Sequence, residues 1–214
     1  MPHLPDLPGA SDALRELAAR GVARSYAKGR LLIEEGDTGD TLYIVLDGRL
    51  RAYSSSADGS REVTYGTYGP GEYVGEMSLD GGPRSAHVEA LERSTCIVVT
   101  RATLESFIAE HPAFAFELLA KVIRRARAAT LTARQMALND VYGRLRLLLQ
   151  SLAEPQPDGG ALIAERLTHK QIAQRIGCSR EMVSRVLKDL ERGGHVAHDV
   201  AGRLTIRRAL PPRW

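Results

Sequence analysis

One segment of the chain, residues 167–190, restricts its local fold more tightly than any other. It reads LTHKQIAQRIGCSREMVSRVLKDL. Thr168 and Gln171 form the capping box that opens a helix, and Gly177 ends that helix because the tight turn needs a left-handed residue. Ser179 caps a second helix, with an inward face of Val183, Val186, Leu187 and Leu190. Two helices joined around a glycine predict a helix-turn-helix.

The outward face of the second helix carries side chains suited to reading double-stranded DNA. Arg180, Ser184 and Lys188 lie four residues apart, as do Glu181 and Arg185, so all five share one exposed stripe. Arg binds guanine O6 and N7 with two hydrogen bonds, and Glu accepts from cytosine N4. We therefore expect Arg180, Glu181 and Arg185 of this stripe to read base edges. The alternative is a solvated face with an internal Glu181–Arg185 ion pair.

Charge divides the chain into two halves. Residues 1–109 contain 11 Lys and Arg against 16 Asp and Glu, whereas residues 110–214 contain 18 against 10. An acidic half and a basic half predict two domains with different partners, and the basic one is a candidate for phosphate backbones. Uneven surface charge without a function is the alternative.

Composition excludes several classes of protein. No apolar run approaches the roughly 18–20 residues that span a bilayer, and the N-terminus lacks the basic and apolar regions of a signal peptide. We therefore expect a cytoplasmic protein with no membrane partner. Cys96 and Cys178 cannot build a four-thiolate site, and His195 and His198 lack a third ligand, so no metal is expected. No Cys-His, Ser-His-Asp or paired-carboxylate constellation is present, so we expect no catalytic residues and no enzyme.

Short β-type runs separated by glycine turns fill residues 23–99. The clearest runs are residues 42–46, 63–65 and 95–99. Their spacing predicts an antiparallel barrel or roll rather than alternating βαβ units. Ahead of them we expect a loose tail over residues 1–10 and a short helix from the Ser11 cap through Arg20, ended by Gly21.

From Pro112 to Leu138 nothing interrupts a helical pattern, which predicts a rod about 40 Å long. Apolar positions spaced three and four apart form a coiled-coil seam: Leu119, Val122, Ala126, Ala129, Ala133 and Met136. The opposite faces carry Arg124, Arg125, Arg127 and Arg134. This pattern favours a dimerisation helix. The alternative is a helix packed on its own domain through the arginines.

The remaining residues complete the predicted domain organisation. Asp140 caps a helix over Val141–Leu152, residues 154–160 form a loop, and the alternating stretch 195–207 forms a wing with residues 161–163 as a third strand. The fold class is α+β. Its four parts are a tail and short helix (1–20), a β-roll (21–110), a dimerisation helix (111–138) and a winged helix-turn-helix (139–214).

The segment Tyr73–Val88 holds the candidate ligand site. Gly75 exposes backbone N–H groups at the start of a single helical turn, and helix N-termini attract phosphate. Arg84 supplies a bidentate charged partner and Ser85 a hydroxyl. Glu76 fits beside a phosphate if it accepts from a ligand hydroxyl such as that of a ribose. The alternative is a polar turn closed by an Arg–Glu salt bridge.

Two stretches carry a resemblance to a known family. Gly75-Glu76-Met77 followed by Pro83-Arg84-Ser85-Ala86 resembles the phosphate-binding cassette of cyclic-nucleotide-binding domains. Residues 177–188 resemble the recognition segment of CRP/FNR transcription regulators, and the likeness extends in order over about residues 20–208. The resemblance implies a homodimeric regulator controlled by a cyclic mononucleotide, cAMP, with RNA polymerase as a further partner.

The resemblance also assigns roles to residues. In cAMP-responsive members, residues matching Glu76, Arg84 and Ser85 hold the ribose and cyclic phosphate, and the long helices close over the base through a Thr-Ser pair. That pair is Ala129 and Thr130 here, so one hydroxyl is missing. Residues matching Arg180, Glu181 and Arg185 read a TGTGA-like half-site. Positions suited to DNA backbone contacts are Ser179, His169 and Lys170.

Ala129 leaves other readings of the effector open. One is a ligand-independent regulator, and another is a regulator that responds to cGMP or cyclic di-GMP. Iron–sulfur members of the family need cysteines that this chain lacks before Cys96, and a haem sensor needs more axial ligands than His87. A nucleotide-sensing effector that does not bind DNA is the alternative from another class.

Overall fold

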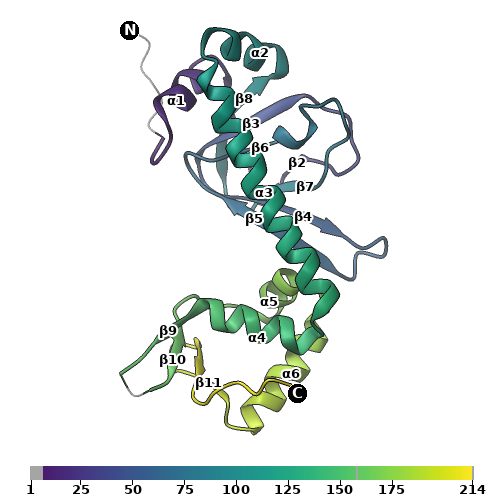
Figure 1. Ribbon diagram of the computed structural model, residues 1–214, viewed down its shortest axis with the longest axis vertical. Coiled ribbons are helices and arrows are strands. Elements are labelled where there is room, and N and C mark those ends of the chain that lie inside the picture. The colour runs from purple at the N-terminus through teal and green to yellow at the C-terminus, as the bar shows by residue number, and fades with distance from the viewer. Residues whose placement is uncertain (1–6, 158, 214) are drawn as a thin grey trace. The chain divides into compact units, whose positions relative to one another are not determined.

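The computed structural model describes residues 7–157 and 159–213 (Figure 1). Residues 1–6 of the expected tail, Asp158 of the expected loop, and Trp214 lie outside the described residues. The chain divides into two compact units, residues 1–54 with 65–129 and residues 55–64 with 130–214. Within the described ranges, no helix combines the length and the apolar character needed to cross a membrane.

Two four-stranded sheets form the N-terminal roll (Figure 1). The first has the order β1 (Val22–Tyr26), β8 (Ser94–Thr100), β3 (Thr41–Asp47) and β6 (Tyr73–Val74). The second has the order β2 (Leu31–Ile33), β7 (His87–Ala90), β4 (Leu50–Ser55) and β5 (Glu62–Tyr68). Alternate side chains of both sheets meet in one core that includes Ile33, Val45, Leu50, Val74, Val88 and Cys96. The antiparallel roll expected from the sequence is confirmed.

Three helices pack against the first sheet of the roll. Ser11 caps α1 (Asp12–Ala18), which is shorter than expected because Ala19 rather than Gly21 forms its C-cap. Thr100 caps α2 (Arg101–Glu110), and α3 (Ala113–Leu138) follows directly. Their shared core with the first sheet includes Leu14, Leu17, Leu42, Ile44, Phe107, Phe114 and Leu118.

Helix α3 has one covered face and one uncovered apolar stripe. Phe114 and Leu118 are buried. Phe116, Leu119 and Ile123 are exposed by 75%, 52% and 41%. The stripe therefore runs through Ile123, and the expected seam position Val122 is half-buried beside it. The structure also differs from expectation at Arg125, which faces the roll and binds it.

The second unit is built around the helix-turn-helix. Asp140 caps α4 (Val141–Leu152), and α5 (His169–Ile176) and α6 (Arg180–Arg192) pack against it. A small sheet has the order β11 (Val196–His198), β12 (Leu204–Ile206), β10 (Ala161–Ile163) and β9 (Ala153–Pro155). The wing and its third strand are confirmed. Strand β9 was expected to be loop, but the edge of β10 pairs with it.

These elements make an α+β fold with an N-terminal roll, a long helix and a C-terminal winged helix-turn-helix, as the sequence predicts. The core of the second unit is apolar and continuous, and it includes Leu145, Leu149, Ile163, Ile172, Val183, Leu187 and Leu190. Each candidate site therefore rests on its own packed core.

Candidate anion pocket and nucleic-acid interface

The backbone of the candidate cassette is set by a strand followed at once by a tight turn. Strand β6 pairs with β3, and Gly75 then leads into the 3₁₀ turn η1 (Glu76–Ser78). Gly75 has φ of 99°, and a Cβ there would lie 2.5 Å from the Thr41 carbonyl oxygen and 3.1 Å from Nη1 of Arg84. Both the left-handed backbone and the lack of space require glycine at this position.

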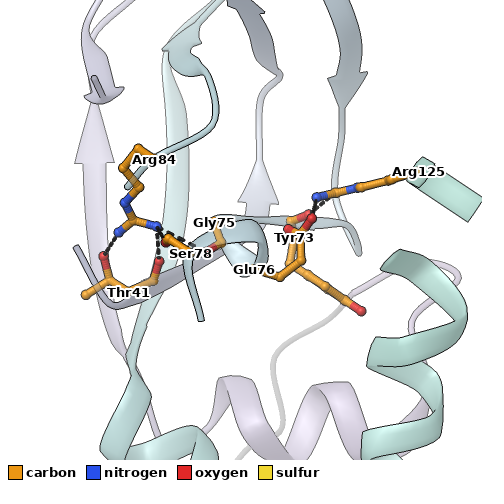
Figure 2. A network of polar contacts seen from close by, with 7 residues as sticks. All are labelled: Thr41, Tyr73, Gly75, Glu76, Ser78, Arg84 and Arg125. Carbon is orange, nitrogen blue, oxygen red and sulfur yellow. Dashed lines mark hydrogen bonds and ion pairs between the residues drawn. The ribbon is translucent and has the colours of Figure 1, made fainter. Parts of the chain in front are cut away.

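Arg84 is only 6% exposed, and its guanidinium is held by neutral acceptors (Figure 2). Nη1 donates to the Thr41 carbonyl (3.0 Å), the Gly75 carbonyl (3.1 Å) and Ser78 Oγ (2.8 Å), and Nη2 donates to Thr41 Oγ1 (2.9 Å). Burial lowers the pKa of Arg84, but an arginine stays protonated in proteins. Among the described residues no carboxylate forms an ion pair with it. Arg84 thus contributes a buried positive charge whose hydrogen-bond partners are all neutral, which suits an anion.

Gly39 makes room for this guanidinium. A Cβ at Gly39 would lie 2.8 Å from both Nε and Nη2 of Arg84. The loop before β3 therefore passes directly over the arginine. A side chain at position 39 would displace either the loop or the guanidinium.

Glu76 lies beside Arg84 and has a different partner. Its side chain is fully buried, and Oε1 accepts a hydrogen bond from Nη1 of Arg125 (Figure 2). Nη2 of Arg125 donates to the Tyr73 carbonyl (2.6 Å). Oε2 of Glu76 is buried and accepts no hydrogen bond from the described residues. Buried acceptors are rarely left without a donor, so this oxygen is suited to a ligand hydroxyl. The Arg–Glu salt bridge that was the alternative for Arg84 and Glu76 is not formed.

The other predicted ligand residues are more open. Ser85 is exposed and its hydroxyl makes no hydrogen bond within the described residues, while Ala86 packs against the core of the roll. Met77 is 47% exposed. Thr130 is exposed on α3. The cassette therefore gathers Gly75, Glu76 and Arg84 around buried charge and leaves Ser85 and Met77 toward solvent.

Sequence reasoning missed three residues of this pocket: Thr41, Ser78 and Arg125. Thr41 is 43 positions from Arg84, and Arg125 is 49 positions from Glu76. No local pattern connects such positions. Ser78 lies inside the predicted cassette, so a hydroxyl in the single helical turn was the one available signal.

The helix-turn-helix is built as the sequence predicts. Thr168 and Gln171 form the capping box of α5, and Gly177 ends α5 with φ of 66°. Ser179 Oγ accepts from the Met182 amide (3.3 Å) and caps α6. The caps fix where α6 begins, and so fix which side chains face outward.

The outward face of α6 forms an open groove. Its lining residues are Arg180, Glu181, Ser184, Arg185, Lys188, Asp189 and Arg192. The first five are exposed. In the described part of the chain, Glu181 and Arg185 form no ion pair with each other or with any other residue. The internal ion pair is therefore absent, and these charged groups are available to a partner.

Positions expected beside the recognition helix differ in exposure. Lys170 is exposed and His169 is half-buried on the first turn of α5. The two wing histidines have local partners: His195 Nδ1 contacts the Ala209 carbonyl (3.0 Å) and His198 Nδ1 contacts Glu191 Oε1 (2.9 Å).

Comparisons with known proteins agree with both halves of this description. Residues 23–111 match the family model of the cyclic nucleotide-binding domain, and residues 143–209 match that of the Crp-like helix-turn-helix domain. A CRP-like cAMP-activated global transcriptional regulator of Mycobacterium tuberculosis is 33% identical over 175 residues, which cover 80% of this chain and 78% of that protein. The chain belongs to the CRP/FNR family of transcription regulators.

A second relative supports the same assignment, and a solved structure supports the fold. The cyclic AMP receptor protein of Thermus thermophilus is 35% identical over 179 residues, covering 81% of this chain and 78% of the relative. The fold matches that of the cyclic di-GMP-responsive regulator CLP of Xanthomonas campestris with a TM-score of 0.77 at 24% identity, covering 92% and 99% of the two chains. The CRP/FNR family consists of transcription regulators, not enzymes. This member has a cyclic nucleotide-binding domain and a DNA-binding helix-turn-helix.

Proposed function

We propose that this CRP/FNR regulator is a homodimer whose binding to a TGTGA-like palindromic site is controlled by a cyclic mononucleotide, with cAMP as the effector. The supporting observation is the arrangement of buried charge in the cassette. Arg84 lacks a carboxylate partner, and Oε2 of Glu76 lacks a donor among the described residues. A ligand that joins a cyclic phosphate to a ribose hydroxyl satisfies both groups, whereas inorganic phosphate satisfies only Arg84.

The cassette residues divide the ligand between them. Arg84 binds the cyclic phosphate, with the Gly75 backbone and the Ser85 hydroxyl beside it. Glu76 accepts the hydrogen bond of the ribose 2′-hydroxyl. Met77 and Ala86 line the cassette, and Thr130 contributes a hydroxyl toward the base.

cAMP is favoured because two relatives, the cAMP-activated regulator of M. tuberculosis and the cyclic AMP receptor protein of T. thermophilus, are named for cAMP. The second candidate is a regulator of the same family that acts without ligand or with cGMP or cyclic di-GMP. It is favoured by Ala129, which lacks a hydroxyl, and by Arg125, which already neutralises Glu76 from within the chain.

The DNA side of the proposal rests on α6 and on a second copy of the chain. The uncovered stripe of Phe116, Leu119 and Ile123 pairs two α3 helices, since three large apolar side chains are otherwise left in water. Two recognition helices then read half-sites one DNA turn apart, through Arg180, Glu181 and Arg185. The DNA backbone is contacted by Ser179, His169 and Lys170, and the same face of α6 adds DNA contacts from Ser184 and Lys188. RNA polymerase is a further partner, in the cytoplasm.

Ligand control is transmitted through Arg125. This side chain joins Glu76 in the cassette to α3, the helix that carries the dimer stripe. A hydroxyl that donates to Oε2 of Glu76 draws negative charge away from Oε1 and weakens the ion pair with Arg125, and so favours one arrangement of α3. A ligand shifts the equilibrium only by its difference in affinity for the two states.

Nucleotide titration by calorimetry tests the proposal. The wild type is expected to bind cAMP, and Arg84→Leu is expected to lose affinity by about 30-fold or more, because a buried charged partner is removed. The matched control is Arg51→Leu. Arg51 is a second buried arginine of the roll, but it pairs with Glu89 (2.8 Å).

Arg51→Leu is expected to lower the melting temperature and leave cAMP affinity unchanged. Equal affinity in wild type and a folded Arg84→Leu would contradict the pocket assignment. If the wild type binds cGMP or cyclic di-GMP but not cAMP, that nucleotide replaces cAMP as the proposed effector. No binding of any nucleotide would favour the ligand-independent candidate.

A further inference from the structure

The cassette residues lie in an order that fixes the direction of a bound nucleotide. In Figure 2, Glu76 lies between Arg84 on one side and Arg125 on the other. If Arg84 binds the cyclic phosphate and Glu76 the 2′-hydroxyl, the ribose spans these two residues. The base is attached to C1′, the carbon next to the one that bears the 2′-hydroxyl. It therefore leaves the ribose on the side of Arg125.

The aromatic ring of Tyr68 lies next to Arg125. The guanidinium carbon of Arg125 lies 4.8 Å from the centre of the Tyr68 ring. Arg125 thus contacts Glu76, the Tyr73 carbonyl and this ring at the same time. Tyr68 is half-buried at the end of β5 and packs against the core of the roll.

A glycine on the same strand makes room for the Tyr68 ring. Gly66 lies two residues earlier, on the same face of β5. A Cβ at Gly66 would lie 2.9 Å from the Tyr68 hydroxyl oxygen and 3.2 Å from Cζ. The ring therefore folds back over Gly66 and occupies space that any other residue at position 66 would fill. Among the described residues, no group hydrogen-bonds the Tyr68 hydroxyl.

We propose that Tyr68, with the Arg125 guanidinium stacked on it, forms the wall of the pocket that receives the nucleotide base and makes the site select purine over pyrimidine cyclic nucleotides. Flat aromatic and guanidinium groups stack on any base, and the larger ring system of a purine gains more from such contact. The inference rests on the proposed cyclic nucleotide function and adds to it a specificity residue that lies outside the cassette.

The test measures the affinity of cAMP, cGMP, cCMP, cUMP and the base-free analogue methyl riboside 3′,5′-cyclic phosphate, by calorimetry or by displacement of cAMP. Tyr68→Leu is expected to weaken cAMP and cGMP by about 5- to 100-fold, the range for loss of a base–aromatic stack. It should change the affinity of the base-free analogue less than twofold. Tyr68→Phe retains the ring and is expected to retain purine affinity.

The chain offers a matched control. Tyr53 lies on β4 of the same sheet, and the guanidinium carbon of Arg51 lies 4.0 Å from the centre of its ring. Its ring also contacts that of His87 (5.1 Å between ring centres). Tyr53→Leu removes an arginine–tyrosine stack of the same kind and is expected to leave all five affinities unchanged.

Each other outcome overturns the inference. Unchanged purine affinity in Tyr68→Leu, or an equal loss for purines and the base-free analogue, would make Tyr68 a structural residue. An equal loss of affinity in Tyr68→Phe and Tyr68→Leu would show that the aromatic ring of Tyr68 does not bind the base. If the wild type binds none of these ligands, the proposed function fails first, so the two failures are distinguishable.

Discussion

The two candidate sites use the same side chain in opposite surroundings. Arg84 is 6% exposed and makes four hydrogen bonds inside the roll. Arg180 and Arg185 are exposed on α6 and have no partner among the described residues. The roll holds the Arg84 guanidinium in one orientation before any ligand binds. The arginine side chains of the recognition helix remain free to change their conformation. A preset buried charge suits one small ligand, and an adjustable charged face suits a long polyanion.

The largest expected difference between the sites is in their response to salt. DNA binding displaces counterions, so a dimer with about 6–10 phosphate contacts should lose roughly 10³–10⁵ in affinity between 50 and 200 mM salt. Screening acts far less on a buried pair, so cAMP affinity should change by less than about threefold. Parallel anisotropy and calorimetry titrations over this salt range measure both. Equal salt slopes would contradict the contrast between buried and exposed charge.

The next effect concerns the unpartnered oxygen of Glu76. Binding of 2′-deoxy-cAMP should be weaker than that of cAMP by about 10- to 150-fold, because a hydrogen bond to a charged group contributes about 1.5–3 kcal/mol. Competition calorimetry on the wild type measures this without altering the fold. The Arg84→Leu variant acts as the control for the phosphate end of the ligand. Equal affinity of the two nucleotides would remove Glu76 from the ribose site.

On the recognition helix, Arg180→Ala should weaken binding to the palindromic site by about 1–3 kcal/mol and relax the preference at one base position. Its matched control is Arg192→Ala, since Arg192 lines the far end of the same groove and pairs with Asp189 (3.3 Å). Anisotropy with specific and random duplexes measures both variants. An equal loss on random DNA would make Arg180 a phosphate contact.

The smallest expected effect is a difference in thiol labelling between the core of the roll and the core of the helix-turn-helix unit. Burial raises the pKa of Cys96 to about 12 and also raises that of Cys178. Cys96 is fully buried in the roll, whereas Cys178 is 7% exposed beside the cap of α6. Thiol labelling followed by mass spectrometry should modify Cys178 first. Faster labelling of Cys96 would indicate a roll that opens more readily than the helix-turn-helix.

The same contrast explains what sequence reasoning could predict. The face of α6 follows from helical period and from caps at Ser179 and Thr168, all within a few residues, and the structure confirms these local features. The partners of Arg84 and Glu76 come from Thr41 and Arg125, which only the folded roll brings close. Gly75 was predicted as a backbone donor, but its left-handed φ and its close approach to Thr41 follow only from the fold of the roll.

The apolar seam of α3 is a second feature that the sequence alone did not fully predict. Spacing of three and four from Leu119 allows either Val122 or Ile123 as the next position. Packing of Phe114 and Leu118 on the roll turns Val122 partly inward and leaves Ile123 in solvent. When a helix has apolar residues on two faces, its sequence alone does not predict which face is buried, because the neighbouring elements decide which face is covered.

The central claim is that nucleotide and DNA binding are coupled, and reciprocity tests it most directly. The affinity for a labelled TGTGA–TCACA duplex is measured by anisotropy at fixed salt with and without saturating cAMP, and cAMP affinity is measured by calorimetry with and without that duplex. Linkage requires the two ratios to be equal, and a coupling of about 5- to 150-fold is expected. Tight DNA binding with both ratios equal to one would retain the regulator and contradict its control by cAMP.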